Sequence, residues 1–379
     1  MKRLAVVGIG RMGGRHARNI AKGVASGARL VAVCDVDAQK LKDFGDKFKV
    51  ATYSDLEDML AKESLDGVII ATPHYSHVEL ASICVNKGVN VLVEKPISVT
   101  TKEARQLVDV LEKNPKVIGA MMFNQRTNRM YRKAKQLIES GAIGNIQRVN
   151  FIVTDWYRTQ FYYDMGGWRA SWSGEGGGTL INQCVHQLDV LQWLVGMPKS
   201  VMSYCYTKNR NISTENDVTA ILRYGDFDCC FTASTHEVPG TNRLEIAGDK
   251  GKIVVEKFKM KYFINEKSES QINELSKRDY GNKSDKKSKK HKLSYGLSRM
   301  IYDGIYGQQV RIISNFVKAL ESGKKDDLIA RAEEGLNCLE LINSINQSSW
   351  LGKEVALPLD GEEYANMLAQ KIEEENTKK

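Results

Sequence analysis

A glycine-rich turn near the N-terminus has the spacing of a phosphate-binding loop. Residues 8–13 read GIGRMG, directly after the apolar run 4–7 and before a helical pattern. In this context the first glycine permits a tight turn, the second admits a pyrophosphate, and the third lets helix and strand pack closely. The helix N-terminus adds unpaired N–H groups and a partial positive charge. The motif therefore predicts a dinucleotide site.

An acidic residue in the expected place indicates which dinucleotide binds. Asp35 ends the next apolar run, 22 residues after Gly13. Its carboxylate can accept hydrogen bonds from the adenosine ribose and would repel a 2′-phosphate. We therefore expect NAD rather than NADP, with Arg11 as the one nearby side chain that could hold a phosphate instead.

Two further segments end predicted parallel strands. The sequence ATPH at 71–74 ends the candidate strand 67–71, and EKP at 94–96 follows the candidate strand 89–93. Ligands in open α/β sheets bind beyond the carboxyl ends of the strands. Lys95 is therefore expected at the cofactor crevice, although a solvated lysine at a loop start is the plainer alternative.

The first 120 residues alternate short apolar runs with helical patterns. Such alternation, together with the glycine motif, predicts a parallel sheet covered by helices on both faces, here a dinucleotide-binding domain over 1–122. The expected strands are 4–7, 30–34, 67–71, 89–93 and 117–120, and the expected helices are 15–24, 38–48, 77–86 and 102–112.

The remaining chain, 123–379, has longer β-branched and aromatic strands joined by short turns. This pattern predicts a second α/β domain with an open, mostly antiparallel sheet. A polar, Lys-rich stretch, 266–299, is expected to be a mobile insert. The expected strands are 147–154, 200–206, 218–224, 228–234, 243–247 and 252–256, and the expected helices are 130–140, 179–195, 308–322, 331–350 and 362–375.

Composition excludes several classes of protein. Hydrophobic residues make up 42% of the chain, yet no apolar run approaches the roughly 20 residues of a membrane span. The apolar stretch after Lys2 ends at Arg11, before any cleavage site for a secretory signal, so we expect a cytoplasmic protein without a membrane partner. Seven scattered cysteines without a CxxC pair predict reduced thiols and no metal centre.

The net charge of +9 is concentrated in one segment. Residues 277–292 carry eight Lys or Arg against two Asp, which leaves +3 for the rest of the chain. Apart from Tyr280 no aromatic residue is interleaved with these charges, as a surface that stacks bases would require. A solvated loop is therefore expected, and no nucleic-acid partner.

Four motifs in order resemble one known family. They are GIGRMG at 8–13, ATP at 71–73 with His77, EKP at 94–96, and GGGTLINQCVHQLD at 176–189. Together they are similar to the glucose–fructose oxidoreductase, inositol dehydrogenase and rhizopine-catabolism (Gfo/Idh/MocA) family over nearly the whole chain. The resemblance implies a Rossmann domain, a C-terminal α/β domain whose open sheet often serves oligomerisation, a nicotinamide cofactor and polyhydroxylated substrates. A homo-oligomer acting on a small carbohydrate or cyclitol is therefore expected.

The resemblance also assigns catalytic roles. The family's EKP lysine matches Lys95, and its active-site histidine matches His186. The acidic residue four positions earlier is Asn182 here, which excludes a base at 182 but keeps a hydrogen-bonding anchor. On one helix Asn182 and His186 would share a face. We expect neutral His186 to act as general base and Lys95 to stabilise the alkoxide.

The remaining assignments concern cofactor and substrate contacts. An aromatic core or subunit interface is an equal alternative for the aromatic residues of the segment 155–169. The residues expected at the cofactor are Gly8, Ile9, Gly10, Arg11, Met12, Asp35, Thr72, Pro73, His74, His77, Glu94, Lys95, Trp168 and Arg169. Those expected at the substrate are Gln125, Arg126, Tyr157, Arg158, Tyr163, Asn182 and His186.

These expectations favour an NAD-dependent dehydrogenase that acts on a secondary alcohol of a sugar, glycoside or cyclitol. Two alternatives stay open. A retained NAD could assist glycoside cleavage or epimerisation by transient oxidation, and the same residues would serve both reactions. A non-enzymatic NAD-binding regulator is the other, which Lys95 and His186 argue against and only the Lys-rich insert supports.

Overall fold

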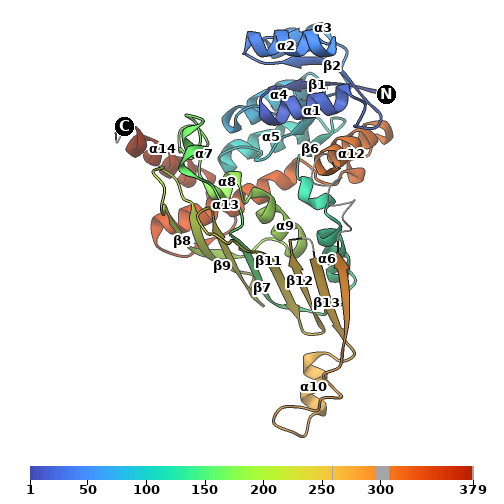
Figure 1. Ribbon diagram of the computed structural model, residues 1–379, viewed down its shortest axis with the longest axis vertical. Coiled ribbons are helices and arrows are strands. Elements are labelled where there is room, and N and C mark those ends of the chain that lie inside the picture. Colours follow the sequence, from blue (N-terminus) through green and yellow to red (C-terminus); the bar gives the residue numbers. More distant parts are fainter. Residues whose placement is uncertain (258, 295–306, 378–379) are drawn as a thin grey trace. The chain divides into compact units, whose positions relative to one another are not determined.

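The computed structural model describes residues 1–257, 259–294 and 307–377, which divide into two compact units. The first unit contains Met1–Thr127, the described part of a segment that ends at Glu340, and Gly361–Ala365. The second contains the described residues from Asn128 to 294, together with Leu341–Asp360 and the C-terminal residues from Asn366. Each unit has its own sheet (Figure 1).

The first unit is a Rossmann domain, as the sequence predicts. Its six strands are all parallel, in the order β3-β2-β1-β4-β5-β6, and the residues of β4 are fully buried. The strands are β1 (Lys2–Val7), β2 (Ala28–Cys34), β3 (Ala51–Tyr53), β4 (Gly67–Ile70), β5 (Asn90–Val93) and β6 (Gly119–Met121). The helices are α1 (Arg11–Ala21), α2 (Ala38–Phe48), α3 (Leu56–Lys62), α4 (His77–Asn86) and α5 (Thr101–Lys113), of which α3, like β3, was not expected from the sequence.

The strand order brings three motifs to one edge of the sheet. The chain order reverses between β1 and β4, and β5 lies next to β4. In parallel sheets the carboxyl ends of neighbouring strands share an edge, and ligands bind at such a reversal. The glycine turn after β1, the ATPH segment after β4 and the EKP segment after β5 therefore follow adjacent strands.

Helix α12 (Gln308–Ser322) corrects the expected division into 1–122 and 123–379. Its bounds match the prediction, but it packs in the first unit. Ile313 and Phe316 are fully buried in the same hydrophobic cluster as Leu4 and Leu92. Sequence periodicity identifies the apolar face of a helix but does not identify the sheet that the face covers.

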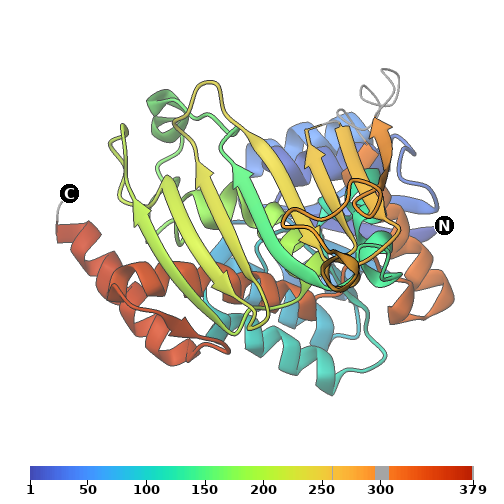
Figure 2. The same ribbon diagram turned by 90° about the horizontal axis from the view of Figure 1, so that it is seen from below.

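The second unit contains a nine-stranded sheet in the order β14-β13-β12-β11-β7-β10-β9-β8-β15. Only β7 and β10 pair in parallel within the described residues, so the sheet is mostly antiparallel, as expected. Figure 2 shows the strands edge to edge. They are β7 (Ile146–Val153), β8 (Ser200–Tyr206), β9 (Asp217–Arg223), β10 (Asp228–Ser234), β11 (Asn242–Gly248), β12 (Gly251–Glu256), β13 (Lys259–Asn265), β14 (Ser288–Ser294) and β15 (Val355–Ala356).

Five helices and the C-terminal parts of two more accompany this sheet in the described residues. Burial alternates along the strands, as in β9, because one face of the sheet is covered and the other is open. The helices are α6 (Arg129–Glu139), α7 (Gln160–Asp164), α8 (Thr179–Asn182), α9 (Val185–Val195) and α10 (Glu269–Leu275), together with the C-terminal parts of α13 (Glu333–Leu351) and α14 (Gly361–Thr377).

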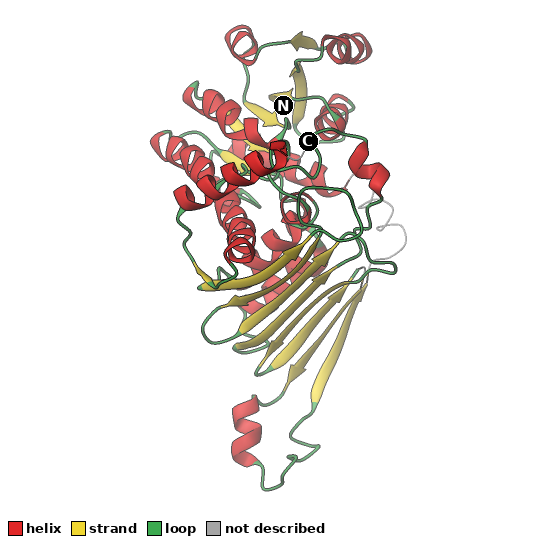
Figure 3. Cartoon of the chain, turned by 90° about the vertical axis from the view of Figure 1, so that its left-hand side faces the viewer, coloured by secondary structure: helices red, strands yellow, loops and turns green. Residues whose placement is uncertain are grey.

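The Lys-rich insert is more ordered than the sequence suggests. Strands β13 and β14 pair along their length, and the ring of His291 stacks on Tyr262 with 4.6 Å between centroids. Helix α10 begins with a capping box at Ser268 and projects beyond these strands (Figure 3). Parts of the expected mobile insert therefore form a helix and an edge strand, whereas 276–287 contain neither. Its mobility stays a prediction, and 295–299 lie outside the described residues.

Candidate active site

The glycine turn has the geometry that a dinucleotide requires. Gly8 has a φ of +81°, and a Cβ on Gly13 would lie 1.8 Å from the Gly8 carbonyl oxygen, so both glycines are needed by the fold itself. A Cβ on exposed Gly10 would meet no protein atom within 4 Å. The space beside Gly10 is thus open for a ligand, where the N-terminus of α1 begins.

Asp35 lies directly beside this turn. Its carboxylate accepts hydrogen bonds from the amides of Ile9 (2.7 Å) and Asp37 (2.9 Å), and the side chain is half-buried. The two bonds hold the carboxylate at the carboxyl end of β2, next to the open space at Gly10. The residues present therefore fit a dinucleotide with an unmodified adenosine ribose.

The EKP segment is tied to the glycine helix by a pair that the sequence did not suggest. His16 Nε2, on α1, lies 2.6 Å from Glu94 Oε1, and both side chains are buried. Glu94 also accepts from the amide of Lys95 (3.1 Å), whose side chain is half-buried. Glu94 thus links the backbone of Lys95 to His16 on α1. The only feature of the sequence that could have indicated this pair is the position of His16, three residues after Gly13.

His77 joins the other two strand ends. Its Nδ1 lies 2.7 Å from the Pro96 carbonyl oxygen and its Nε2 2.8 Å from that of Thr72. Burial lowers the pKa of His77 below its ordinary value. With both nitrogens on backbone atoms, His77 holds the two loops together, so its expected role as a direct cofactor contact is replaced by a positioning role.

In the second unit, the motif segment exposes two polar side chains. Every residue from 179 to 192 is buried except Asn182 and His186, which are half-buried. The segment is not one helix, however. Helix α8 ends at Asn182 and α9 begins at Val185, and the amide of Cys184 bonds to the Thr179 carbonyl oxygen at 2.8 Å. The expectation of a single helix over 179–195 is wrong, because Asn182 ends α8 and His186 lies in the first turn of α9.

Glu175 fixes the orientation of Asn182. The Asn182 amide nitrogen donates to Glu175 Oε1, and Glu175 Oε2 accepts from the amide of Ala170 at 2.7 Å. Ala170 follows Trp168 and Arg169 and has a φ of +47°, in the left-handed region that non-glycine residues rarely adopt. One buried carboxylate therefore holds both the turn after Arg169 and the proposed anchor Asn182.

Two more carboxylates hold the same stretch of chain. Glu215 accepts from the amides of Gly178 (3.0 Å) and Leu180 (2.9 Å) at the start of α8. Glu375, on α14, accepts from the amides of Trp172 and Ser173, both at 3.1 Å. Burial raises the pKa of Glu215 to about 7. These carboxylates could not be predicted from the sequence, since a lone Glu is most often solvated.

An aromatic and arginine cluster lies beside the motif segment. The Arg158 guanidinium lies over the rings of Trp156 and Tyr162, at 5.4 and 4.8 Å, and Arg169 lies 4.7 Å from the Trp168 ring. The Tyr162 hydroxyl accepts from Arg169 (2.8 Å) and from the Gln183 amide (3.3 Å). Tyr157 and Trp168 are exposed, at 43% and 39%.

Two expected substrate residues have structural contacts instead. Tyr163 is buried and its hydroxyl lies 2.9 Å from Thr235 Oγ1, and burial raises its pKa. Arg126, in the short helix Asn124–Thr127, is 1% exposed and donates to Glu334 at 2.6 Å. Both contacts place these side chains in the interior, so neither is retained as a substrate contact, whereas the neighbouring Gln125 is half-buried.

The expected residues thus fall into two sets, one in each unit. The first unit gathers those of the glycine turn, Asp35, the ATPH segment and Lys95 along adjacent strands. The second gathers Asn182, His186 and the arginine and aromatic cluster. Among the described residues no group of three His, Cys, Asp or Glu side chains is placed to hold a metal ion, and no described helix is long and apolar enough to cross a membrane.

Known proteins resemble the chain in both sequence and structure. The rhizopine catabolism protein MocA of Rhizobium meliloti is 34% identical over 195 residues, 51% of this chain and 57% of that protein. Inositol 2-dehydrogenase of Salmonella typhimurium is 29% identical over 226 residues, 57% of this chain and 62% of that enzyme. The matched part of this chain thus spans about three fifths of these curated relatives.

A solved structure matches over almost the entire chain. The WlbA dehydrogenase from Bordetella pertussis, in complex with NADH and UDP-GlcNAcA, has a TM-score of 0.76 and 26% identity. The match covers 95% of this chain and 99% of that one.

Two family models match successive parts of the sequence. Residues 2–122 match the oxidoreductase family with an NAD-binding Rossmann fold, and residues 131–254 match the Gfo/Idh/MocA C-terminal domain. Both belong to one family and together they span well over half of the chain. The chain therefore belongs to the Gfo/Idh/MocA oxidoreductase family.

Proposed function

We propose that this chain is an NAD-dependent dehydrogenase that oxidises a secondary alcohol of a sugar, glycoside or cyclitol, or reduces the corresponding ketone. The observation that carries the proposal is the exposure of Asn182 and His186 alone in a segment that is otherwise buried from 179 to 192. His186 is half-buried although the residues from 183 to 185 and from 187 to 192 are buried, as expected for a side chain that faces a ligand. The inositol dehydrogenase name of one relative and the NADH of the WlbA complex support this class.

The residues of the first unit would hold the cofactor. The pyrophosphate would lie at Gly10 and the N-terminus of α1, and the ribose hydroxyls at Asp35. When bound, NAD supplies the hydride acceptor. Other proposed contacts come from the turn and the strand ends, and from one pair in the second unit: Gly8, Ile9, Arg11, Met12, Thr72, Pro73, His74, Glu94, Lys95, Trp168 and Arg169.

Three side chains would act on the alcohol. Neutral His186 takes the hydroxyl proton, since an imidazole titrates near neutral pH and suits a general base. The Lys95 ammonium stabilises the negative charge that develops on the oxygen. Asn182, oriented by its bond to Glu175, hydrogen-bonds a neighbouring hydroxyl and fixes the carbon that is oxidised. Tyr157, Arg158 and Gln125 are the further proposed substrate contacts.

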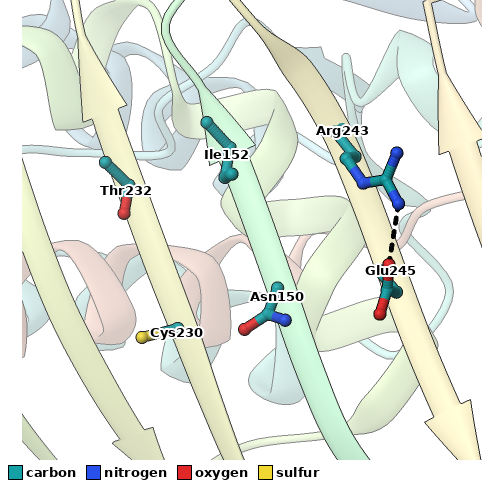
Figure 4. A pocket seen from close by; sticks show the side chains of 6 residues that line it. All are labelled: Asn150, Ile152, Cys230, Thr232, Arg243 and Glu245. Atoms are coloured by element: carbon teal, nitrogen blue, oxygen red, sulfur yellow. Dashed lines mark hydrogen bonds and ion pairs between the residues drawn. The ribbon is translucent and has the colours of Figure 1, made fainter.

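We further propose a cytoplasmic homo-oligomer. Seven free thiols, among them the exposed Cys230, are compatible with a reducing compartment. The open face of the second sheet exposes Tyr204, Tyr206 and Ile221 at 52%, 51% and 43%. It also has a shallow pocket, in which Arg243 pairs with Glu245 at 2.8 Å (Figure 4). The pocket is lined by Asn150, Ile152, Cys230, Thr232, Arg243 and Glu245.

A second copy covering this face would remove these apolar side chains from water. Light scattering should then give at least a dimer, and Ile221→Asp should shift it toward the monomer, because a carboxylate would be buried unpaired. The exposed Val238→Asp is the control, since its side chain is 74% exposed in a loop and outside the sheet. A monomeric wild-type chain would refute the proposed assembly.

The test of the proposed activity is a screen for NADH formation. Purified chain and NAD are mixed with neutral and acidic sugars, glycosides and inositols, and NADH absorbance is followed. Substrate-dependent NADH is the expected result. Conversion of a glycoside or epimer without net NADH would favour the retained-cofactor reaction, and NAD binding without any conversion would favour a regulator.

A further inference from the structure

We infer that the substrate carries an oxyanion, a carboxylate or a phosphate, which is bound by Arg158 and Arg210 beside the motif segment. This inference rests on the proposed dehydrogenase function and adds the charge of its substrate. All the residues that support it lie in the second unit.

The two arginines are held in place before any ligand binds. The Arg158 guanidinium lies over the rings of Trp156 and Tyr162, and the Arg210 guanidinium lies 5.3 Å from the Tyr157 ring. Arg210 Nε donates to the Arg158 carbonyl oxygen at 2.8 Å, and the Arg158 amide donates to the Thr235 carbonyl oxygen at 2.8 Å. A guanidinium fixed on an aromatic face presents its planar fork in one orientation, which suits a carboxylate or a phosphate.

Neither guanidinium is neutralised by the protein. Within the described parts of the chain, their side-chain hydrogen bonds go to backbone carbonyl oxygens, and neither forms an ion pair. The nearest carboxylates in the sequence have other partners. Asp155 accepts from Asn242 (3.2 Å), and Asp164 accepts from Gln160 (2.9 Å). Glu215 accepts from the amides of Gly178 and Leu180, and Asp217 pairs with Lys208 and His236.

Two buried donors in the same cluster lack an acceptor. Arg158 Nε and Trp156 Nε1 are buried from solvent and have no hydrogen-bond partner in the described residues. Buried donors are nearly always satisfied, because an unsatisfied one loses its bond to water. A ligand oxygen would satisfy a donor of this kind, and two donors on adjacent stacked side chains point to an oxyanion.

The cluster is connected to the motif segment by direct hydrogen bonds. The Arg158 guanidinium lies over the ring of Tyr162. The hydroxyl of Tyr162 accepts a hydrogen bond from the side chain of Gln183, the residue next to Asn182. This contact places the cluster next to the segment that carries Asn182, so the oxyanion and the alcohol that Asn182 orients would belong to one substrate molecule. A carboxylate on the oxidised sugar and a phosphate on its anomeric oxygen both satisfy this geometry.

The test compares matched substrates on the full chain. Initial rates of NAD reduction are measured for a hexose, the corresponding hexuronate, the hexose phosphate and a nucleoside-diphosphate hexose. We expect kcat/KM for at least one charged member to exceed that of the neutral hexose by at least about 10-fold and to fall as salt is added. The preferred member identifies the source of the oxyanion.

Variants then assign the effect to the arginine. Arg158→Gln should raise KM for the charged substrate about 10- to 100-fold, with a small change in kcat and none for a neutral substrate. Arg158→Lys keeps the positive charge but loses the planar guanidinium, so its KM for the charged substrate should lie between those of wild type and Arg158→Gln. Arg331→Gln is the control, because Arg331 lies in the first unit, is exposed and already pairs with Asp326.

The outcomes separate this inference from the proposed function. Equal use of neutral and charged sugars, or an equal effect of Arg158→Gln on both, would overturn the inference while the dehydrogenase assignment stands. If no sugar reduces NAD but charged sugars still raise the melting temperature in an Arg158-dependent manner, the inference stands and the dehydrogenase assignment fails. Absence of both turnover and Arg158-dependent binding overturns both.

Discussion

The buried Glu215 should make the stability of the second unit depend on pH. The pKa of this carboxyl is raised from 4.5 to about 7 by burial, so the folded state holds its proton more tightly than the unfolded state. For an acid with a raised pKa, the folded state is favoured below pH 4.5, and the free energy of unfolding falls as pH rises toward 7. This difference between the folded-state and unfolded-state pKa lowers the free energy of unfolding by roughly 3 kcal/mol as the pH rises through that range.

The variant Glu215→Gln tests this reasoning, because glutamine keeps an acceptor for the amides of Gly178 and Leu180. Urea unfolding should be followed by Trp fluorescence at pH 4.5, 6 and 8.5. We expect the variant to gain stability relative to wild type as pH rises, by up to roughly 3 kcal/mol at pH 8.5. Glu245→Gln is the contrasting control, since arginine partners lower the pKa of Glu245 to about 2. A Glu215→Gln effect that stays constant across pH would refute the raised pKa.

Three other predictions concern the cofactor turn and the anchor. Gly10→Ala should leave the melting temperature unchanged but weaken NAD binding, measured by calorimetry, at least about 10-fold. Gly13→Ala should also lower the melting temperature, because its Cβ would overlap a carbonyl oxygen. Equal changes in melting temperature and in NAD affinity for the two variants would contradict this prediction. Asp35→Ser should weaken NAD binding and reduce the preference for NAD over NADP, and an unchanged ratio of the two Kd values would exclude its ribose contact. Glu175→Gln should raise KM through loss of Asn182 orientation with NAD affinity unchanged, and an unaltered KM would remove that positioning role.

The sequence was sufficient for the fold of each unit wherever local pattern and long-range packing agree. Buried parallel strands such as β4 are continuous apolar runs, and β8, β10 and α12 begin and end at the predicted residues. The packing partner of α12 was not predictable, because an apolar helix face fits either sheet. The edge strand β14 was also missed, since its lysines and serines lack an apolar side.

The candidate site divides in the same way. Glycine spacing identified the turn because Gly8 adopts a positive φ and a Cβ on Gly13 would overlap the Gly8 carbonyl oxygen, and both constraints arise within the turn itself. The carboxylates of Glu175, Glu215 and Glu375 were missed, because each reaches backbone amides far away in sequence or across an irregular loop. The break between α8 and α9 was missed too, since the apolar pattern continues through it.

The central claim is that His186 removes the proton of the alcohol that is oxidised. The most direct test is the turnover of His186→Ala, measured together with its Kd for NAD. We expect an unchanged Kd and a decrease in kcat of at least ~100-fold, the usual size of a general-base contribution. Turnover close to that of wild type would contradict the mechanism proposed for this chain.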